Sequence, residues 1–344
     1  MPELDDYVPN KAGASKGSKG VNVRRAQNYL KQFGYMESDV LEKYGVEETR
    51  VDVEPAPDTM GTFDDQTEQA LRTFQQFHGL EVTGELDQAT VDQMNKPRCG
   101  FPDTAEYVLQ GNKWDTTNLR YGFVNFSGDL TQNQTRAAIS AAFSYWAAVT
   151  PLSFSEIPNN QNPEIRIRFA TGNHGDGSPF DGGGGVLAHA FYPPPNGGDI
   201  AGDVHFDDAE TWTINLPPSG IDLYTVAAHE IGHALGLAHS TVNAALMYPY
   251  YGGPHRFLDQ DDIDGIQALY GAAQWHHNKA IQRLYTSHHS QNCWVYVQGL
   301  GWRKVQTGTV DGVTNMFFTL SQARAHGTNV SLYIEDNTIR IMYL

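Results

Sequence analysis

The stretch HEIGHALGLAHS, from His229 to Ser240, brings together residue types that bind a metal ion and use it. If the stretch begins as a helix, His229 and His233 lie four residues apart on one face, so both imidazoles can bind the same ion. Gly236 can adopt a left-handed conformation and turn the chain, which would return His239 as a third ligand. Three neutral histidines leave one coordination position open, which is typical of a catalytic zinc site rather than a structural one.

Glu230 adds a base to this set. It lies about 100° around the helix axis from His229, outside the ligand set but within reach of a water beside the ion. HExxH alone occurs by chance in many helices, whereas the five fixed positions of HExxHxxGxxH make chance a poor explanation. Met247, in the downstream stretch ALMYPYYG, would pack beneath the ion as a soft apolar floor, although taken alone it is an ordinary core residue.

Cys99 is one of only two cysteines, and it lies in the rigid turn KPRCGFPD. A thiolate is a strong zinc ligand, with a Zn–S distance of about 2.3 Å. If the turn crosses the active-site cleft, the Cys99 sulfur fills the open zinc position and excludes the water that catalysis requires. The alternative is a buried and inert thiol. Cys293, the other cysteine, is expected to be a free or buried thiol.

A second group of metal-binding residues lies in the Gly- and Asp-rich segment 172–210. Three imidazoles and one carboxylate are enough to close a tetrahedral zinc site with no open position. These residues are His174, Asp176, His189 and His205. Nearby, Asp181, Asp207 and Glu210 supply hard carboxylate oxygens, and the glycines of PFDGGGGV leave backbone carbonyls free to point inward. This combination suits calcium.

The elements around these residues predict a multidomain protein. Three helical patterns predict a small all-α unit. They lie in VNVRRAQNYLKQFGY, TFDDQTEQALRTFQQFHGL and DQATVDQMN, and we expect Thr62 to be the N-cap of the second helix. An acidic insertion separates the first two. From residue 107 onward, strand patterns such as EIRIRFA and VLAHAFY alternate with amphipathic helices. They predict an α+β domain with a twisted, mainly parallel sheet and three helices, and a small ββαββ module follows at the C-terminus.

We divide the chain where its composition changes. The predicted units are a disordered N-terminus (1–20), a helical domain that ends at the Cys99 turn (21–105), an α+β domain (106–271), a linker (272–290) and a C-terminal module (291–344).

Several stretches together resemble the matrix metalloproteinases, or matrixins, of the metzincin clan. They are PRCGFPD, HGDGSPFDGGGGVLAHAF, GDVHFDDAE, HEIGHALGLAHS, ALMYP and DDIDGIQALYG. The resemblance covers residues 21–271, the acidic insertion excepted, and keeps the matrixin order of helical prodomain, cysteine switch and catalytic domain. It implies a zinc-dependent endopeptidase made as a zymogen. Cys99 would hold it latent, and an activating protease would remove the prodomain.

The resemblance also implies metal sites. The group around His174 would bind a structural zinc. One calcium would be bound by carboxylates and by three backbone carbonyls, on Asp181, Gly182, Gly184, Val186, Asp207 and Glu210. Asp203 matches a ligand of another calcium, beside Ala201, which replaces a glycine common in the family.

Further roles follow from the same resemblance. Ala188 would accept a substrate backbone bond, because VLAHAFY would present a strand edge to an extended peptide. Thr225 would shape the main specificity pocket. Arg98 and Asp103 would pair and brace the switch loop. After cleavage beyond the switch, the new ammonium group would pair with Asp264.

The net charge and the hydropathy of the chain limit which classes of partner it can bind. The chain has 23 Lys and Arg against 40 Asp and Glu, a net charge of −17, which argues against nucleic acid and anionic membranes. The sequence contains no apolar run of about 18 residues, so we expect no transmembrane helix. We expect a monomer with protein or peptide substrates. The family resemblance implies a secreted protein, although the polar N-terminus shows no signal-peptide core.

A binding protein is the main alternative. The N-terminal helices also resemble a peptidoglycan-binding-like domain, so the chain could attach to cell-wall glycan, with the zinc domain as a non-catalytic scaffold. Glu230 favours the enzyme, because a scaffold has no use for a base beside a water. At the C-terminus, Trp294, Tyr296 and Trp302 form either a carbohydrate- or protein-binding face or ordinary core and cross-strand pairs. The linker histidines are either solvated or metal-binding; they are His276, His277, His288 and His289.

Overall fold

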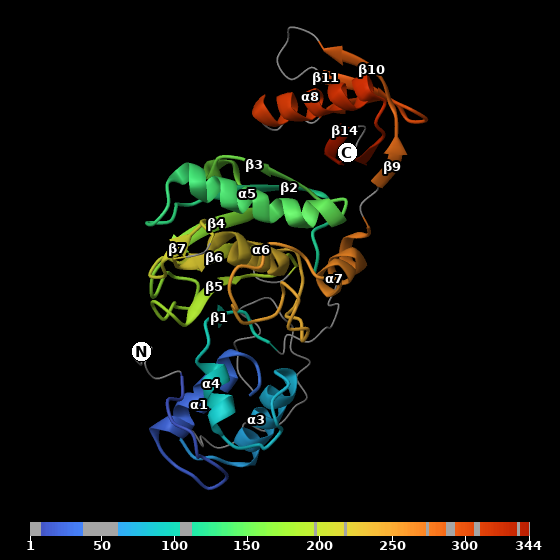
Figure 1. Ribbon diagram of the computed structural model, residues 1–344. Coiled ribbons are helices and arrows are strands. Elements are labelled where there is room, and N and C mark those ends of the chain that lie inside the picture. The colour runs from blue at the N-terminus through green and yellow to red at the C-terminus, as the bar shows by residue number, and fades with distance from the viewer. Residues whose placement is uncertain are drawn as a thin grey trace.

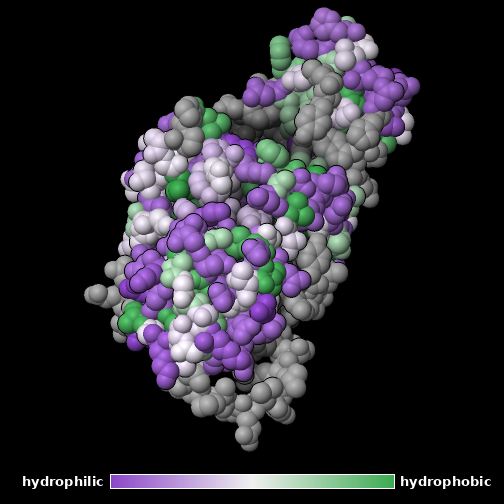
Figure 2. All heavy atoms as spheres, turned by 60° about the horizontal axis from the view of Figure 1, so that its bottom comes forward, coloured by the Kyte–Doolittle hydropathy of each residue, from purple (hydrophilic) through white to green (hydrophobic). Residues whose placement is uncertain are grey.

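The computed structural model describes nine stretches of the chain: residues 8–36, 61–103, 112–195, 198–216, 219–272, 275–286, 293–305, 310–335 and 338–343. They form a helical unit, a central α+β domain and a C-terminal sheet with one helix, in that order along the chain (Figure 1). Each unit has its own cluster of buried apolar side chains. The face shown in Figure 2 is mostly hydrophilic, with apolar residues in scattered groups. The predicted multidomain fold is confirmed.

The helical unit contains α1 (Val21–Gln32), α3 (Asp65–Phe77) and α4 (Gln88–Met94). The inward stripes of α1 and α3 meet, and Leu30, Leu71 and Phe74 are fully buried between them. Both α3 and α4 begin at an aspartate whose carboxylate accepts a backbone N–H of the first turn. The predicted helices are therefore present.

Two predictions for this unit are wrong. Asp64, not Thr62, is the N-cap of α3. Residues 8–20 belong to the predicted disordered segment, yet they are bound to the helices through their backbone. Gly13 N–H donates to the Leu86 carbonyl and Gly20 N–H to that of Gly61, both at 2.8 Å. Composition hides such contacts, because the backbone makes these bonds and only the small or isolated apolar side chains of Val8, Ala12 and Ala14 pack against the core. Residues 1–7 and the acidic insertion from 37 to 60 lie outside the described residues.

The central domain is built on a six-stranded sheet with the strand order β1-β5-β6-β4-β2-β3. Its strands are β1 (Arg98–Cys99), β2 (Asn118–Phe123), β3 (Ser153–Glu156), β4 (Ile165–Ala170), β5 (Val186–Ala190) and β6 (Val204–Asp207). All neighbouring pairs are parallel except β5 and β6, which confirms the mainly parallel sheet. A short parallel pair, β7 (Trp212–Thr213) and β8 (Ile221–Asp222), lies beside it.

Three helices cover this sheet and one another: α5 (Gln132–Val149), α6 (Leu223–Ala234) and α7 (Gln260–Tyr270). In α5, Ile139, Phe143 and Trp146 are buried, and the indole N–H of Trp146 donates to the Ala228 carbonyl of α6 at 3.0 Å. Asp259 is the N-cap of α7 and forms a capping box there. Helix α6 is thus fixed against α5 through a buried hydrogen bond.

The C-terminal unit is a second six-stranded sheet with the order β10-β11-β12-β14-β13-β9. It contains β9 (Trp275–Lys279), β10 (Ile281–Thr286), β11 (Cys293–Val297), β12 (Gly301–Val305), α8 (Val310–His326), β13 (Val330–Glu335) and β14 (Thr338–Tyr343). The predicted ββαββ pattern is present in β11, β12, α8, β13 and β14, but the predicted linker is wrong, since β9 and β10 form within it and extend the sheet. Both are edge strands without clear apolar alternation, which explains why their sequence did not reveal them. His288 and His289 lie outside the described residues.

Candidate active site

Helix α6 and the turn after it position three histidines. His229 and His233 lie one helical turn apart, and the chain reverses at Gly236, whose φ is 106°, so that His239 faces them. The Nε2 atom of His229 lies 3.1 Å from that of His233 and 3.3 Å from that of His239. These separations match imidazoles that share one tetrahedral zinc, for which each Zn–N bond is about 2.0–2.1 Å.

Backbone carbonyls fix the orientation of two of these rings. The Nδ1 atom of His229 lies 2.7 Å from the Leu246 carbonyl, and that of His233 lies 2.7 Å from the Leu237 carbonyl. Nε2 is therefore the nitrogen left to face an ion. Burial lowers the pKa of all three histidines, that of His229 to about 3, so the rings are neutral. This donor set fits zinc.

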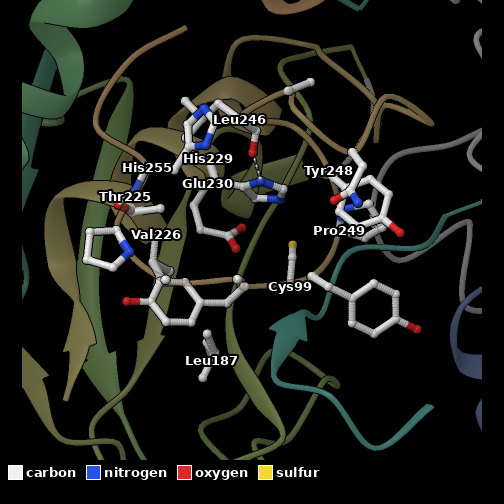
Figure 3. Close-up of a pocket in the computed structure, with 17 residues that line it drawn as sticks. Cys99, Leu187, Thr225, Val226, His229, Glu230, Leu246, Tyr248, Pro249 and His255 are labelled. Atoms are coloured by element: carbon white, nitrogen blue, oxygen red, sulfur yellow. Dashed lines mark hydrogen bonds between the residues drawn. The ribbon is translucent and has the colours of Figure 1, made fainter. Parts of the chain in front are cut away.

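Cys99 completes the group. Its Sγ and one nitrogen from each histidine all lie within 4.8 Å of one another. The sulfur points toward the His229 ring and the Glu230 carboxylate (Figure 3). Burial and the negative charge of Glu230 raise the pKa of Cys99 well above its ordinary value, so a thiolate here requires a cation beside it. The predicted position of Cys99 at the triad is confirmed.

Glu230 is fully buried next to the triad. Burial raises the pKa of its carboxyl to about 8, and the neighbouring Cys99 thiol offsets part of that effect. No described residue offers either oxygen a hydrogen bond of ordinary geometry. A carboxyl group held in this way, without a structural partner, is suited to exchanging a proton with a substrate or a water.

Met247 lies beneath the triad, as predicted for the floor of the site. It is 2% exposed, and a Cβ added to Gly232, between the two helical histidines, would lie 2.4 Å from the Met247 sulfur. The Asp262 carboxylate accepts the backbone N–H groups of Leu246 and Met247 at 2.8 and 2.9 Å. Helix α7 thereby holds the methionine turn against α6.

The Cys99 turn lies along the outer edge of β5. Cys99 is in register with Ala188, and the N–H of Gly100 donates to the Ala188 carbonyl at 2.8 Å. On the other side, the N–H of Cys99 donates to the Pro249 carbonyl at 2.9 Å. The turn therefore bridges the cleft between β5 and the methionine turn. It occupies the backbone acceptor that the matrixin resemblance assigns to substrate.

A buried polar network braces this turn. The predicted ion pair of Arg98 and Asp103 is present, with both side chains almost completely buried. Arg98 donates to the Tyr29 hydroxyl at 2.9 Å, and the Tyr35 hydroxyl donates to Asp103 at 2.7 Å. Burial opposes ionisation of Asp103, but Arg98 and His239 lower its pKa well below the ordinary value. Asp103 is therefore a charged carboxylate inside the protein.

Sequence reasoning missed the partners of this ion pair. The guanidinium of Arg98 lies 3.5 Å from the centroid of the Phe33 ring, and Tyr29 and Tyr250 share a hydrogen bond at 2.8 Å beside it. His78, at the end of α3, lies 3.4 Å from Asp103. These residues come from α1, from α3 and from the methionine turn. No local spacing links them, so only the folded chain brings them together.

A cavity of about 280 Å³ opens beside Glu230 and extends under the methionine turn. Leu187, Thr225 and Val226 line one part, residues between 243 and 255 line another, and the zinc-binding end is lined by Cys99, His229 and Glu230 (Figure 3). The Thr225 hydroxyl is already bonded, because it accepts the N–H of His255 and donates to Asp222, both at 2.7 Å. Thr225 therefore lines the cavity, as the predicted pocket residue should.

The second predicted zinc group also converges. One ligand atom from each of its four members lies within 4.8 Å of the others; the members are His174, Asp176, His189 and His205. One carboxylate oxygen of Asp176 lies 2.6 to 2.8 Å from a ring nitrogen of all three histidines. Burial opposes ionisation of Asp176, but these three histidines lower its pKa. The set fits a closed, structural zinc site.

The predicted calcium ligands form a looser group. The N–H of Gly182 donates to Asp207 at 3.1 Å and that of Gly184 donates to Glu210 at 2.6 Å. Burial, with repulsion between the carboxylates, raises the pKa of Asp181 to about 6. Among the described residues, only the two histidine-containing groups converge within 4.8 Å, so calcium remains a prediction.

Two other predicted residues have different surroundings. Asp203 is buried and lies 3.7 Å from the Arg166 guanidinium, and burial raises its pKa to about 7. Asp264 is exposed on α7 and accepts a hydrogen bond from Gln260 at 2.7 Å. The segment from 104 to 111, which would carry a new amino terminus, lies outside the described residues. Their predicted roles remain predictions.

The site and the fold together define a class of protein. Two helical histidines, a third after a glycine turn, an adjacent buried glutamate and a methionine floor, all on a mainly parallel sheet, define a zinc metalloendopeptidase site. Comparison with known families gives the particular family. Residues 113–271 match the model described as Matrixin, and residues 19–94 match the one described as "Putative peptidoglycan binding domain". Residues 113–271 are therefore a matrixin catalytic domain.

Individual relatives show how far the similarity extends. The interstitial collagenase of Bos taurus is 51% identical over 208 residues, which cover 59% of this chain and 43% of that protein. The hatching enzyme of Paracentrotus lividus is 44% identical over 248 residues, which cover 68% of this chain and 41% of that protein. This chain therefore matches less than half the length of these curated relatives.

Proposed function

We propose that this chain is the latent form of a zinc-dependent endopeptidase that Cys99 holds inactive until the prodomain is removed. One observation carries the proposal: the Cys99 sulfur converges with the three histidines of the zinc-binding triad and lies beside the Glu230 carboxyl. A structural zinc site would have four permanent ligands. Here the fourth ligand comes from a turn outside the matched matrixin segment, and cleavage can remove that turn.

In the proposed reaction, a peptide replaces the Cys99 turn in the cleft. When bound by the triad, zinc supplies Lewis acidity toward water and toward the scissile carbonyl. Glu230, the buried carboxyl beside the triad, accepts a proton from the attacking water in its carboxylate form and passes it to the leaving nitrogen. The Ala188 carbonyl accepts a substrate N–H in place of Gly100, and the cavity beside Thr225 receives a substrate side chain.

Several finer statements belong to the same proposal. A calcium ion would neutralise Asp181, Asp207 and Glu210, which repel one another in its absence. Protein substrates, an activating protease and secretion follow from the similarity to matrixins. Among the described residues no helix is long and apolar enough to cross a membrane. A purely wall-binding role has less support, because it gives no use to the buried Glu230 carboxyl.

Limited trypsin treatment followed by digestion of a peptide library tests the proposal. We expect the intact chain to be inactive and the trypsin-treated chain to cleave peptides, with a chelator abolishing the activity. The variant Glu230→Ala should undergo the same trypsin cleavage and retain zinc, yet lose activity by at least about 100-fold. An active Glu230→Ala enzyme, or an intact chain as active as the cut one, would overturn the proposal.

A further inference from the structure

The C-terminal sheet has one covered face and one open face. Helix α8 packs against β10, β11 and β12, and Val295, Val297 and Leu320 are fully buried between the helix and the sheet. Directly opposed residues of antiparallel strands point to the same face. The strand pairing therefore determines which side chains lie on the face away from α8.

Four aromatic residues and two cations lie on that open face. Tyr296 is opposite Arg283 in β10 and Trp302 in β12, and Trp294 is opposite Tyr285 and Lys304. We call this set the aromatic face; it consists of Arg283, Tyr285, Trp294, Tyr296, Trp302 and Lys304. The rings of Tyr296 and Trp302 meet edge to face with centroids 5.5 Å apart, and the Arg283 guanidinium lies 5.8 Å from the Tyr296 centroid.

The aromatic face is accessible in a way that a core is not. Tyr285 is 52% exposed and Trp302 is 39% exposed, while Trp294 and Tyr296 are half-buried between them. Residues on neighbouring strands lie about 4.8 Å apart and alternate residues along a strand about 7 Å apart, so the four rings form one continuous, partly exposed apolar platform. The negative faces of its exposed rings suit the C–H-lined faces of sugar rings.

The charge of this unit differs in sign from that of the whole chain. Residues 275–344 contain six Lys and Arg against three Asp and Glu, whereas the chain as a whole contains 23 against 40. At physiological salt, charges act over only about 8 Å, so a ligand on this face meets the local cations rather than the distant acids. Arg283 and Lys304 lie at opposite strands of the platform and can each bind a carboxylate.

We propose that the aromatic face binds an extended polysaccharide that carries carboxylates, such as a polymer of uronic acids. The face has four aromatic rings and two cations. We therefore expect ring stacking to supply most of the affinity and the two cations to favour acidic glycans over neutral ones. Nucleic acid fits less well, because its affinity depends mainly on Lys and Arg contacts to a phosphate at every nucleotide. This site is independent of the proposed peptidase activity, since it shares no residue or element with the zinc-binding cleft.

Affinity electrophoresis of the full chain tests the proposal, with polygalacturonate, hydroxyethyl cellulose or poly(U) embedded in native gels. We expect polygalacturonate to retard the chain strongly, the neutral polymer weakly and poly(U) not at all. The double variant Tyr285→Ala/Trp302→Ala should weaken retardation about tenfold, because two of the four stacking rings are removed. Arg283→Gln/Lys304→Gln should abolish the preference for the acidic polymer over the neutral one.

Phe318→Ala is the matched control. Phe318 is 63% exposed on α8, which covers the opposite face, so its loss should leave retardation unchanged. Circular dichroism of each variant checks that the sheet is intact. The proposal is overturned if polygalacturonate does not retard the folded chain, if the two polysaccharides retard it equally, if poly(U) retards it instead, or if Phe318→Ala weakens binding as much as the double aromatic variant.

Discussion

At the scale of single residues, the chemistry depends on buried titratable groups. Glu230 and Cys99 occupy one small buried volume, where burial opposes charge on both and the negative charge of Glu230 further opposes a thiolate at Cys99. The three histidines beside them are neutral and directed inward. A divalent cation resolves this conflict, because it favours both the thiolate and the carboxylate. The residues are therefore arranged for an ion, and the sulfur excludes water from it.

Removal of the sulfur tests whether it maintains latency. We expect Cys99→Ser to cleave peptides without trypsin treatment, since a hydroxyl is a much poorer zinc ligand than a thiolate. The matched control is Cys293→Ser, which alters the other cysteine, far from the triad, and should leave the chain latent. The measurement is the peptidase rate of each intact chain. A Cys99→Ser variant that is inactive before trypsin treatment and active after it would show that the thiol does not maintain latency.

Metal content tests the two histidine groups separately. Elemental analysis of the purified intact chain should find two zinc ions. We expect His233→Ala and His205→Ala each to retain one, because each substitution removes a ligand from only one group. His205→Ala should also lower the melting temperature, since three residues of a closed site lose their shared ion. Two zinc ions retained in His205→Ala would contradict the assignment of the second group.

At the scale of elements, one sharp turn decides the geometry of the triad. Helix α6 supplies two ligands at fixed spacing, but the third depends on the reversal at Gly236. A Cβ on Gly236 would lie 2.3 Å from the Asn112 carbonyl oxygen, and its φ of 106° is strained for any other residue. The segment that begins the central domain therefore packs tightly over the turn and holds it closed.

Gly236→Ala should consequently destabilise the fold by more than about 1 kcal/mol and weaken zinc binding, because His239 moves with the turn. Gly252→Ala provides the control, since an added Cβ there meets no atom within 4 Å and the φ is not positive. Chemical denaturation and zinc competition against a chelating dye measure the two effects. Equal stability and zinc affinity in both variants would show that the turn does not position His239.

Most helices and strands could be predicted from the sequence, and some could not. The zinc motifs, α5 to α7 and the strands β2 to β6 follow from local periodicity and spacing and were predicted, whereas the two residues of β1 were predicted as part of a turn. The backbone-bonded segment 8–20 and the edge strands β9 and β10 were not, because their contacts leave no apolar pattern. The tyrosines around Arg98 and Asp103 were also missed. They lie on separate elements, so their role exists only in three dimensions.

At the scale of the whole molecule, the prodomain and the catalytic domain share one buried charge network. Arg98 and Asp103 belong to the switch, Tyr29 and Tyr35 to the helical unit, and His239 to the triad. Removing one member of a buried ion pair leaves the other uncompensated, which typically costs about 3–5 kcal/mol. The network therefore couples docking of the prodomain to occupancy of the cleft by Cys99.

Arg98→Ala should loosen that docking. In a Cys293→Ser background, we expect Cys99 to be alkylated much faster than in the parent and the intact chain to show peptidase activity. Arg120→Ala is the matched control, because the Arg120–Glu164 pair is partly exposed and solvent screens it. Mass spectrometry after timed alkylation reports the difference. If Cys99 is alkylated as slowly in Arg98→Ala as in the parent, the ion pair does not contribute to latency.

The prodomain supplies strand β1 to the sheet of the catalytic domain, and removal of the prodomain changes that sheet. Removing Arg98 and Cys99 strips β5 of its outer neighbour, while β6 stays paired on the other side, and leaves unpaired backbone donors and acceptors at that border of the sheet. An open border of this kind can pair with any extended chain, including another copy of the same protein. We therefore expect freshly activated molecules to self-associate more readily than the intact chain, and to remain dispersed best when peptide is already present.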